Sequence, residues 1–173
     1  MTRFKGHNIK APIFGISRLR MGTDGCGITT LVTFMGCPLK CKYCLNRKCH
    51  EPIYETDGKT LRNGIMMLTP KELYEDFIIE FKKLCGDRWK ITLETCLRCS
   101  DDTIKHLSSV ADLWIVDIKS MNPNIYKEYT GRDSEILQQL KTISTLVHRD
   151  KVIVKVPYIP GYNDGSDLDA NVE

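Results

Sequence analysis

The sequence has no long apolar run and no large excess of charge of one sign. A membrane-spanning helix needs about 20 consecutive apolar residues, and the 173-residue chain contains no such stretch. Its 25 Lys and Arg residues against 22 Asp and Glu residues leave a net charge of +3. These charges are scattered, which indicates neither a nucleic-acid surface nor a membrane surface. Because the polar start of the chain is unlike a signal peptide, we expect a cytoplasmic protein without nucleic-acid or membrane partners.

The sequence also lacks repeats and low-complexity tracts. With 42% hydrophobic residues it can bury a core, so we expect a single domain over residues 1–173. Strand-like and helix-like segments alternate, which is typical of an α/β fold with a parallel sheet and outer crossover helices. Strands are expected at 28–35, 90–95, 113–119 and 151–157, and helices at 69–86, from 100 onward, 123–130 and 134–148. The stretch 51–64 is expected to be a surface loop, and the tail after 165 to be frayed.

Cysteine, in contrast, is abundant. Eight cysteines without an export signal indicate metal or redox chemistry in a reducing compartment. Cys37, Cys41 and Cys44 form a CxxxCxxC pattern directly after the expected strand 28–35, in a loop spanning residues 36–46. Thiolates are the soft ligands of iron-sulfur clusters, and three of them would leave one iron of a 4Fe-4S cluster open for a substrate.

The same spacing leaves two other interpretations open. Zinc would use Cys49 and His50 as further ligands, and a disulfide framework is the third interpretation. We favour iron because the segment leading into the loop is a strand rich in β-branched and aromatic residues, where a zinc knuckle is unusual. Tyr43, beside the last cysteine, would contact the adenine of a nucleotide-like ligand or simply pack over the cluster.

Polar residues also lie at or near the ends of the other expected strands. Parallel sheets carry their functional groups at the carboxyl ends of the strands, and the residues found there are Glu94, Thr95, Asp117, Lys119 and Lys155. Glu94 and Asp117 are also compatible with capping the next helix, and Lys119 with a solvated ion pair to Asp117. A lysine beside an acid nevertheless suits the carboxylate of an amino-acid-like ligand.

Three further cysteines have their own interpretations. Cys96 and Cys99 form a CxxC just beyond the strand 90–95, which is compatible with metal or redox chemistry or with no role at all. Cys85 lies on the apolar side of its expected helix and is predicted to be a core residue.

These motifs together resemble a known family. The glycines from Gly22 to Gly25, the strand that follows, and Cys37 to Cys44 with Asn46 and Arg47 resemble the start of the radical S-adenosylmethionine superfamily. They are most similar to the glycyl radical enzyme activases related to pyruvate formate-lyase activating enzyme. The similarity continues at 93–95, 114–122 and 154–161, and covers most of residues 13–165.

The resemblance implies a shortened partial (β/α) barrel and an anaerobic oxidoreductase. It implies a 4Fe-4S cluster on Cys37, Cys41 and Cys44, and S-adenosylmethionine as second cofactor. One electron from a flavodoxin-like or ferredoxin-like donor would cleave S-adenosylmethionine to a 5'-deoxyadenosyl radical, which would take hydrogen from a glycine of a glycyl radical enzyme. The residues that it places at S-adenosylmethionine are Tyr43, Asn46, Glu94, Thr95, Asp117 and Lys119, and Lys155 is placed at the substrate.

Two features depart from the family pattern. The Gly-Gly-Glu segment that holds the amino group of S-adenosylmethionine is missing between the cluster loop and Leu93. The chain also stops at Glu173, soon after the Pro160-Gly161 turn, where full-length relatives continue. Three hypotheses remain: an activase with weakened cofactor binding, a cluster-binding or zinc-binding protein that no longer cleaves S-adenosylmethionine, and one part of a split enzyme.

Overall fold

The computed structural model describes residues 11–22, 27–50, 53–54, 60–61 and 74–172. Its strands are β1 (Ile13–Met21), β2 (Ile28–Phe34), β3 (Ile53–Tyr54), β4 (Thr60–Leu61), β5 (Thr92–Thr95), β6 (Leu113–Asp117) and β7 (Val152–Lys155). Its helices are α1 (Asp76–Cys85), α2 (Asp101–Ser108), α3 (Pro123–Thr130), α4 (Ile136–Leu146) and α5 (Ser166–Val172), with 3-10 turns η1 (Arg47–His50), η3 (Gly86–Arg88) and η4 (Arg149–Lys151). Among the helices described, none is long and apolar enough to cross a membrane.

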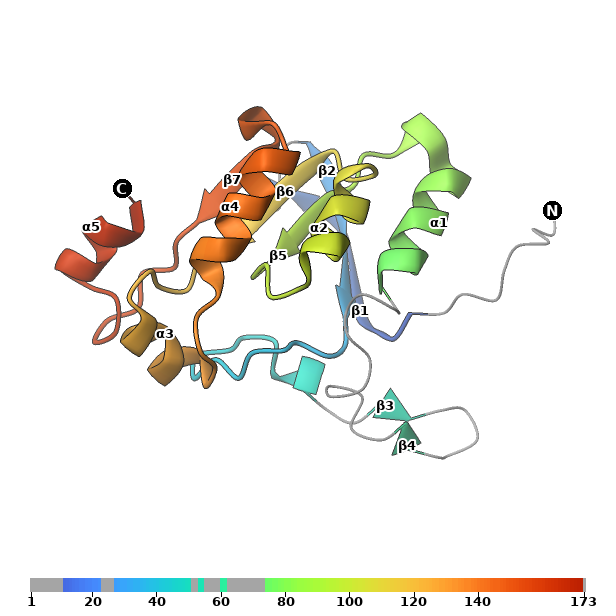
Figure 1. Ribbon diagram of the computed structural model, residues 1–173. Helices are drawn as coiled ribbons and strands as arrows, with labels where there is room; N and C mark the ends of the chain where they lie inside the picture. Colours follow the sequence, from blue (N-terminus) through green and yellow to red (C-terminus); the bar gives the residue numbers. More distant parts are fainter. Residues whose placement is uncertain (1–10, 23–26, 51–52, 55–59, 62–73, 173) are drawn as a thin grey trace.

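The centre of the fold is a parallel sheet of three strands in the order β5-β6-β7. Helices α2 and α4 connect consecutive strands and lie side by side over one face of this sheet (Figure 1). This arrangement confirms the expected α/β class with a parallel sheet and outer helices. It also agrees with a shortened partial barrel.

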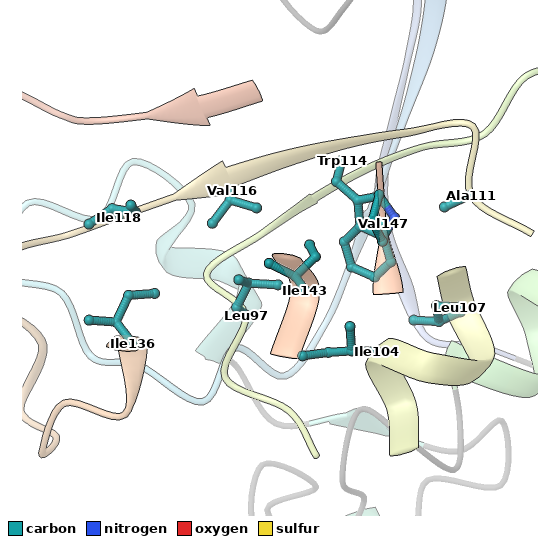
Figure 2. Close-up of a cluster of buried hydrophobic side chains, with 10 residues drawn as sticks. All are labelled: Leu97, Ile104, Leu107, Ala111, Trp114, Val116, Ile118, Ile136, Ile143 and Val147. Atoms are coloured by element: carbon teal, nitrogen blue, oxygen red, sulfur yellow. The ribbon is translucent and has the colours of Figure 1, made fainter. Parts of the chain in front are cut away.

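The hydrophobic core lies between that sheet face and the two helices. Side chains alternate across a strand, so Trp114 and Val116 of β6 point toward Ile104 of α2 and Ile143 of α4 (Figure 2). All four are at most 2% exposed. Burying an aliphatic side chain of this size contributes about 1.5–3 kcal/mol, so this layer fixes the sheet and therefore the position of its strand ends.

The opposite sheet face carries the polar strand-end residues. Glu94 pairs in register with Ile115, and Asp117 pairs with Lys155. The two-residue period of the strands therefore places Glu94, Asp117 and Lys155 on the same face, away from α2 and α4. Three of the residues selected from the sequence thus share one surface at the carboxyl edge of the sheet.

The strand expected at 28–35 exists as β2, but its surroundings differ from the prediction. It pairs antiparallel with β1, in a separate two-stranded sheet, whereas we expected a buried strand in the parallel sheet. Ile28 is 71% exposed, so β2 is only partly covered. The strand β1 was not expected from the sequence, and the continuous β-branched run in β2 does not distinguish a parallel partner from an antiparallel one.

The remaining elements follow the sequence with small differences. Helix α3 begins and ends as predicted, with Asn122 as N-cap, Pro123 in the first turn and Gly131 left-handed at the C-cap (φ 71°). Cys85 is buried, as predicted. The expected helix start at 69–73 and most of the loop 51–64 lie outside the described residues. The tail expected to be frayed forms α5, where the Asn171 side chain accepts a hydrogen bond from the Met121 backbone (2.6 Å).

Candidate metal centre and cofactor site

The cysteine loop between β2 and η1 is fixed by backbone hydrogen bonds at both ends. Gly36 adopts a positive φ of 90°, which a non-glycine residue would adopt only with strain, and donates to the Cys49 carbonyl (2.8 Å). Lys40 and Lys42 donate to the carbonyls of Thr130 and Tyr129 at the end of α3 (2.8 and 3.0 Å). The loop is therefore held beside the C-terminal turn of α3.

The three cysteines of the motif are partly buried in this loop. Cys37, Cys41 and Cys44 are free thiols, as are the other four cysteines that the structure describes. A tight turn brings the last two together, since the Cys44 amide donates to the Cys41 carbonyl (3.1 Å). For the described cysteines the disulfide interpretation is therefore wrong, and the loop offers three thiols as ligands.

The thiols differ strongly in acidity. The pKa of Cys37 is lowered to about 6, first because the Cys96 thiol donates a hydrogen bond to it, and further by the Lys119 ammonium. Burial raises the pKa of Cys41 to about 11. Donating to Cys37 also raises the pKa of Cys96. Without a metal, Cys37 is therefore mostly ionised at neutral pH, whereas Cys41 is protonated.

A cluster of four charges lies at the carboxyl edge of the sheet. The Lys155 ammonium donates to the Glu94 carboxylate (2.7 Å), and Lys119 donates to Asp117. Burial disfavours the charged form of Lys119, but the attraction of Asp117 outweighs it and raises the Lys119 pKa. The same Lys119 acts electrostatically on Cys37 and Cys41. The structure thus brings the cysteine loop and the charged strand ends together.

One acceptor in this charged cluster has no partner in the part of the chain that the structure describes. The Oδ1 atom of Asp117 is buried and accepts no hydrogen bond there, while Oδ2 of the same carboxylate is paired with Lys119. An unpaired buried carboxylate oxygen costs free energy. A ligand with an ammonium or hydroxyl donor would satisfy it.

The other residues selected from the sequence have mixed surroundings. Tyr43 is 58% exposed and contacts the rings of Tyr129 (centroids 6.1 Å apart) and Tyr162 (5.7 Å). The Thr95 hydroxyl accepts from the Leu97 amide (3.0 Å), and Asn46 is exposed. Contact of these three with a cofactor stays a prediction.

Two cysteines that the sequence offered only as alternative metal or redox residues lie beside the loop. Cys96 contacts Cys37, and Cys49 lies with Cys44 and His50 in a group whose ligand atoms are all within 4.8 Å of one another. The CxxC at the end of β5 could have indicated that Cys96 lies near the cluster loop, because the ends of β5 and β2 were both expected at the site. For Cys49 the signal was its short distance in sequence from Cys44.

Known proteins similar to this chain are consistent with the site. No protein-family model matches the chain. The chain is 26% identical over 168 residues to pyruvate formate-lyase 1-activating enzyme of Escherichia coli K12, covering 83% of this chain and 66% of the relative. It is also 26% identical over 167 residues to pyruvate formate-lyase-activating enzyme of Streptococcus mutans, covering 82% of this chain and 63% of the relative. The chain thus spans about two thirds of the length of these relatives.

A third relative is choline trimethylamine-lyase activating enzyme of Oleidesulfovibrio alaskensis, 23% identical over 236 aligned positions that cover 91% of this chain and 75% of the relative. Because that alignment is longer than the 173-residue chain, the relative carries segments without a counterpart here. A solved domain of pyruvate formate-lyase-activating enzyme from Bacteroides vulgatus matches with a TM-score of 0.48 and 24% identity, covering 57% of this chain and 62% of that domain. The sequence relatives confirm the resemblance to glycyl radical enzyme activases of the radical S-adenosylmethionine type.

Proposed function

We propose that this chain is an iron-sulfur oxidoreductase of the activase type. Cys37, Cys41 and Cys44 would hold three irons of a 4Fe-4S cluster, and S-adenosylmethionine would bind between the open iron and the charged sheet edge. The observation that supports this best is the position of Lys119, which acts on two thiols of the loop and pairs with Asp117 at the end of β6.

The donor set fits a cluster. Three thiols from one turn are soft ligands, and Lys119 beside them offsets part of the negative charge that a thiolate-bound cluster carries. Tyr43, Tyr129 and Tyr162 pack against one another at the same loop. This aromatic group would restrict water at one side of the cluster.

The charged edge fits the amino-acid end of S-adenosylmethionine. The unpaired Oδ1 of Asp117 would accept a hydrogen bond from the ammonium group, and Lys119 would face the carboxylate. Asp117 would thereby replace part of what the missing Gly-Gly-Glu segment supplies. Loss of one charge-assisted contact costs about 1.5–3 kcal/mol, roughly a 10-fold to 100-fold weaker affinity. The affinity for S-adenosylmethionine would therefore depend strongly on the contact with Asp117.

When bound, the cluster and S-adenosylmethionine would together supply a 5'-deoxyadenosyl radical after one-electron reduction by a flavodoxin-like or ferredoxin-like protein. The hydrogen donor would be a glycine of a glycyl radical enzyme, and the setting an anaerobic cytoplasm. Lys155, more exposed than Lys119, would face the protein substrate. The chain's own residues would bind the cluster, orient S-adenosylmethionine, shield the site from water and pair with the charges of the ligand.

The test is formation of 5'-deoxyadenosine under anaerobic conditions. The chain is reconstituted with iron and sulfide, reduced with dithionite and incubated with S-adenosylmethionine, and the product is measured by chromatography. The expected result is 5'-deoxyadenosine that is lost in Cys37→Ala, Cys41→Ala and Cys44→Ala. Cys85→Ala is the matched control, because Cys85 is a buried thiol in α1 and should leave the product unchanged.

The outcomes separate the hypotheses. A 4Fe-4S spectrum without 5'-deoxyadenosine would contradict the activase and favour a binding protein or one part of a split enzyme. A 4Fe-4S spectrum that survives in all three loop variants would contradict the assignment of the ligands.

A further inference from the structure

We propose that Cys37, Cys44, Cys49 and His50 form a second metal site, which binds Zn²⁺ and shares two thiols with the cluster loop. The zinc site itself does not depend on the proposed function. Only its competition with the cluster rests on that function.

Three of the four ligands are already gathered. The ligand atoms of Cys44, Cys49 and His50 all lie within 4.8 Å of one another. Around a tetrahedral zinc ion with bonds of 2.0–2.3 Å, ligand atoms are roughly 3.5–3.8 Å apart. Closing the group around an ion therefore needs movements of about 1 Å, within reach of side-chain rotation.

One ring nitrogen of His50 is free to bind a metal. Its Nδ1 atom is buried and has no hydrogen-bond partner among the residues that the structure describes. A buried nitrogen without a partner costs free energy unless a donor, water or metal satisfies it. Neutral imidazole is a common zinc ligand, so metal binding would remove this cost.

The fourth ligand is Cys37. The Cys49 thiol is hydrogen-bonded to the thiols of Cys37 and Cys44, so Cys37 adjoins the group formed by Cys44, Cys49 and His50. With His50 the set is three thiols and one imidazole, which is typical of closed structural zinc sites that keep no position for substrate.

The backbone holds these ligands without the metal. Cys49 and His50 belong to η1, where the Cys49 amide donates to the Asn46 carbonyl (2.9 Å). The Cys49 carbonyl accepts from Gly36, the residue before Cys37 (2.8 Å). This bond ties η1 to the start of the cysteine loop, so the two halves of the site are connected directly.

Zinc and the 4Fe-4S cluster would then exclude each other. Both need Cys37 and Cys44, but only the cluster needs Cys41, and only zinc needs Cys49 and His50. Substitutions can therefore be chosen that remove a ligand of one metal site and leave the other site intact. It also predicts that zinc converts the chain to a form that cannot accept a cluster.

The experiment titrates the metal-free 173-residue chain with Zn²⁺ against a chromophoric chelator, under anaerobic reducing conditions. Cys49→Ser and His50→Gln should each weaken zinc affinity by about 100-fold or more, because one of four ligands is lost. Cys41→Ser should leave zinc affinity within about threefold. In iron and sulfide reconstitution the order reverses: Cys41→Ser should lose the 4Fe-4S spectrum, and Cys49→Ser and His50→Gln should keep it.

Two results would overturn the proposal. Equal zinc affinity in the wild-type chain, Cys49→Ser and His50→Gln would mean that zinc binds elsewhere. An equal loss in Cys41→Ser and Cys49→Ser would mean that zinc binds nonspecifically to the thiols of the loop.

Circular dichroism of each metal-free variant checks that it is folded, and Co²⁺ spectra of the wild-type chain should show tetrahedral thiolate coordination. Failure to form 5'-deoxyadenosine would contradict the activase while leaving the zinc titration unaffected.

Discussion

Lys155 of β7 donates a hydrogen bond of 2.7 Å to Glu94 of β5, although β6 separates the two strands. The ion pair therefore crosses over the carboxyl end of β6, where Asp117 lies. This contact links the outer strands on the face opposite the core helices. The hydrogen bond to Glu94 also raises the pKa of Lys155 above its ordinary value.

We predict that Glu94→Gln affects ligand binding more than stability. The two side chains are 33% and 53% exposed, and a pair of this exposure contributes about 0–1 kcal/mol to folding. If S-adenosylmethionine binds at this edge, losing the carboxylate should weaken its affinity about 10-fold. Calorimetric titration of the reconstituted chain and urea unfolding measure the two effects.

Lys127→Met supplies the control for that prediction. Lys127 pairs with Asp133 at 2.9 Å and is exposed on α3, outside the charged edge. Its loss should change neither affinity nor stability by more than about 0.5 kcal/mol. An equal effect of both substitutions on affinity would contradict a site at the sheet edge.

A second prediction concerns the reactivity of the metal-free loop. Because the pKa of Cys37 is about 6 and that of Cys41 about 11, iodoacetamide should label Cys37 before Cys41 at pH 7. The Cys37 rate should rise with pH around its pKa of about 6 and level off near pH 8, roughly two units above it, where the thiol is almost fully ionised. Mass spectrometry of peptides labelled over short times gives the rate at each cysteine.

Cys96→Ala should shift that pH profile. The hydrogen bond donated by Cys96 is the largest cause of the low Cys37 pKa, so its loss raises the pKa and slows labelling at pH 6. Cys99→Ala, in the same CxxC, is the control. The Cys99 thiol is not among the groups that act on Cys37, and its substitution should leave the profile in place. Equal profiles for all three chains would contradict the Cys37–Cys96 contact.

Much of the fold could be predicted from the sequence, and the reasons are local. The boundaries of α3 follow from Asn122, Pro123 and Gly131, each of which acts within one turn. The antiparallel partner of β2 could not be predicted, because pairing depends on tertiary contacts that a single strand does not encode. The strand-end rule placed Glu94, Asp117 and Lys155 near one another, but the contacts of Cys37 with Cys96 and of Cys44 with Cys49 and His50 required coordinates.

A third prediction tests the core on a single helix. Ile143 of α4 is 2% exposed and packs in the layer with Trp114, whereas Leu137 of the same helix is 59% exposed. Ile143→Ala should lower the free energy of unfolding by about 2–5 kcal/mol, from lost burial and the cavity left behind. Leu137→Ala should change it by about 0.5 kcal/mol or less. Urea unfolding of both variants checks the difference, and similar losses would contradict the position of α4 on the sheet.

The last prediction concerns Asn163, which is fully buried behind the charged edge. Its Oδ1 accepts from the Ile159 amide (2.6 Å), and its Nδ2 donates to the carbonyls of Pro157 (2.5 Å) and Lys119 (3.4 Å). Asn163→Ala removes both the acceptor and the donor at any pH, and should lower the free energy of unfolding by about 1–3 kcal/mol. Asn163→Asp instead places a carboxylate oxygen opposite two carbonyl oxygens, so the folded state favours the protonated acid.

The sign of the pH dependence follows from that preference. An acid whose pKa is raised in the folded state is best tolerated below its unfolded pKa of about 3.9, and stability is lost as the pH rises through the folded value. Asn163→Asp should therefore be close to the wild-type chain near pH 4 and less stable at pH 7, while the deficit of Asn163→Ala stays nearly constant. Urea unfolding at both pH values measures the two trends. A deficit of Asn163→Asp that does not grow with pH would mean that the side chain at 163 does not face the Pro157 and Lys119 carbonyls, and so does not hold the backbone of Lys119 at the charged edge.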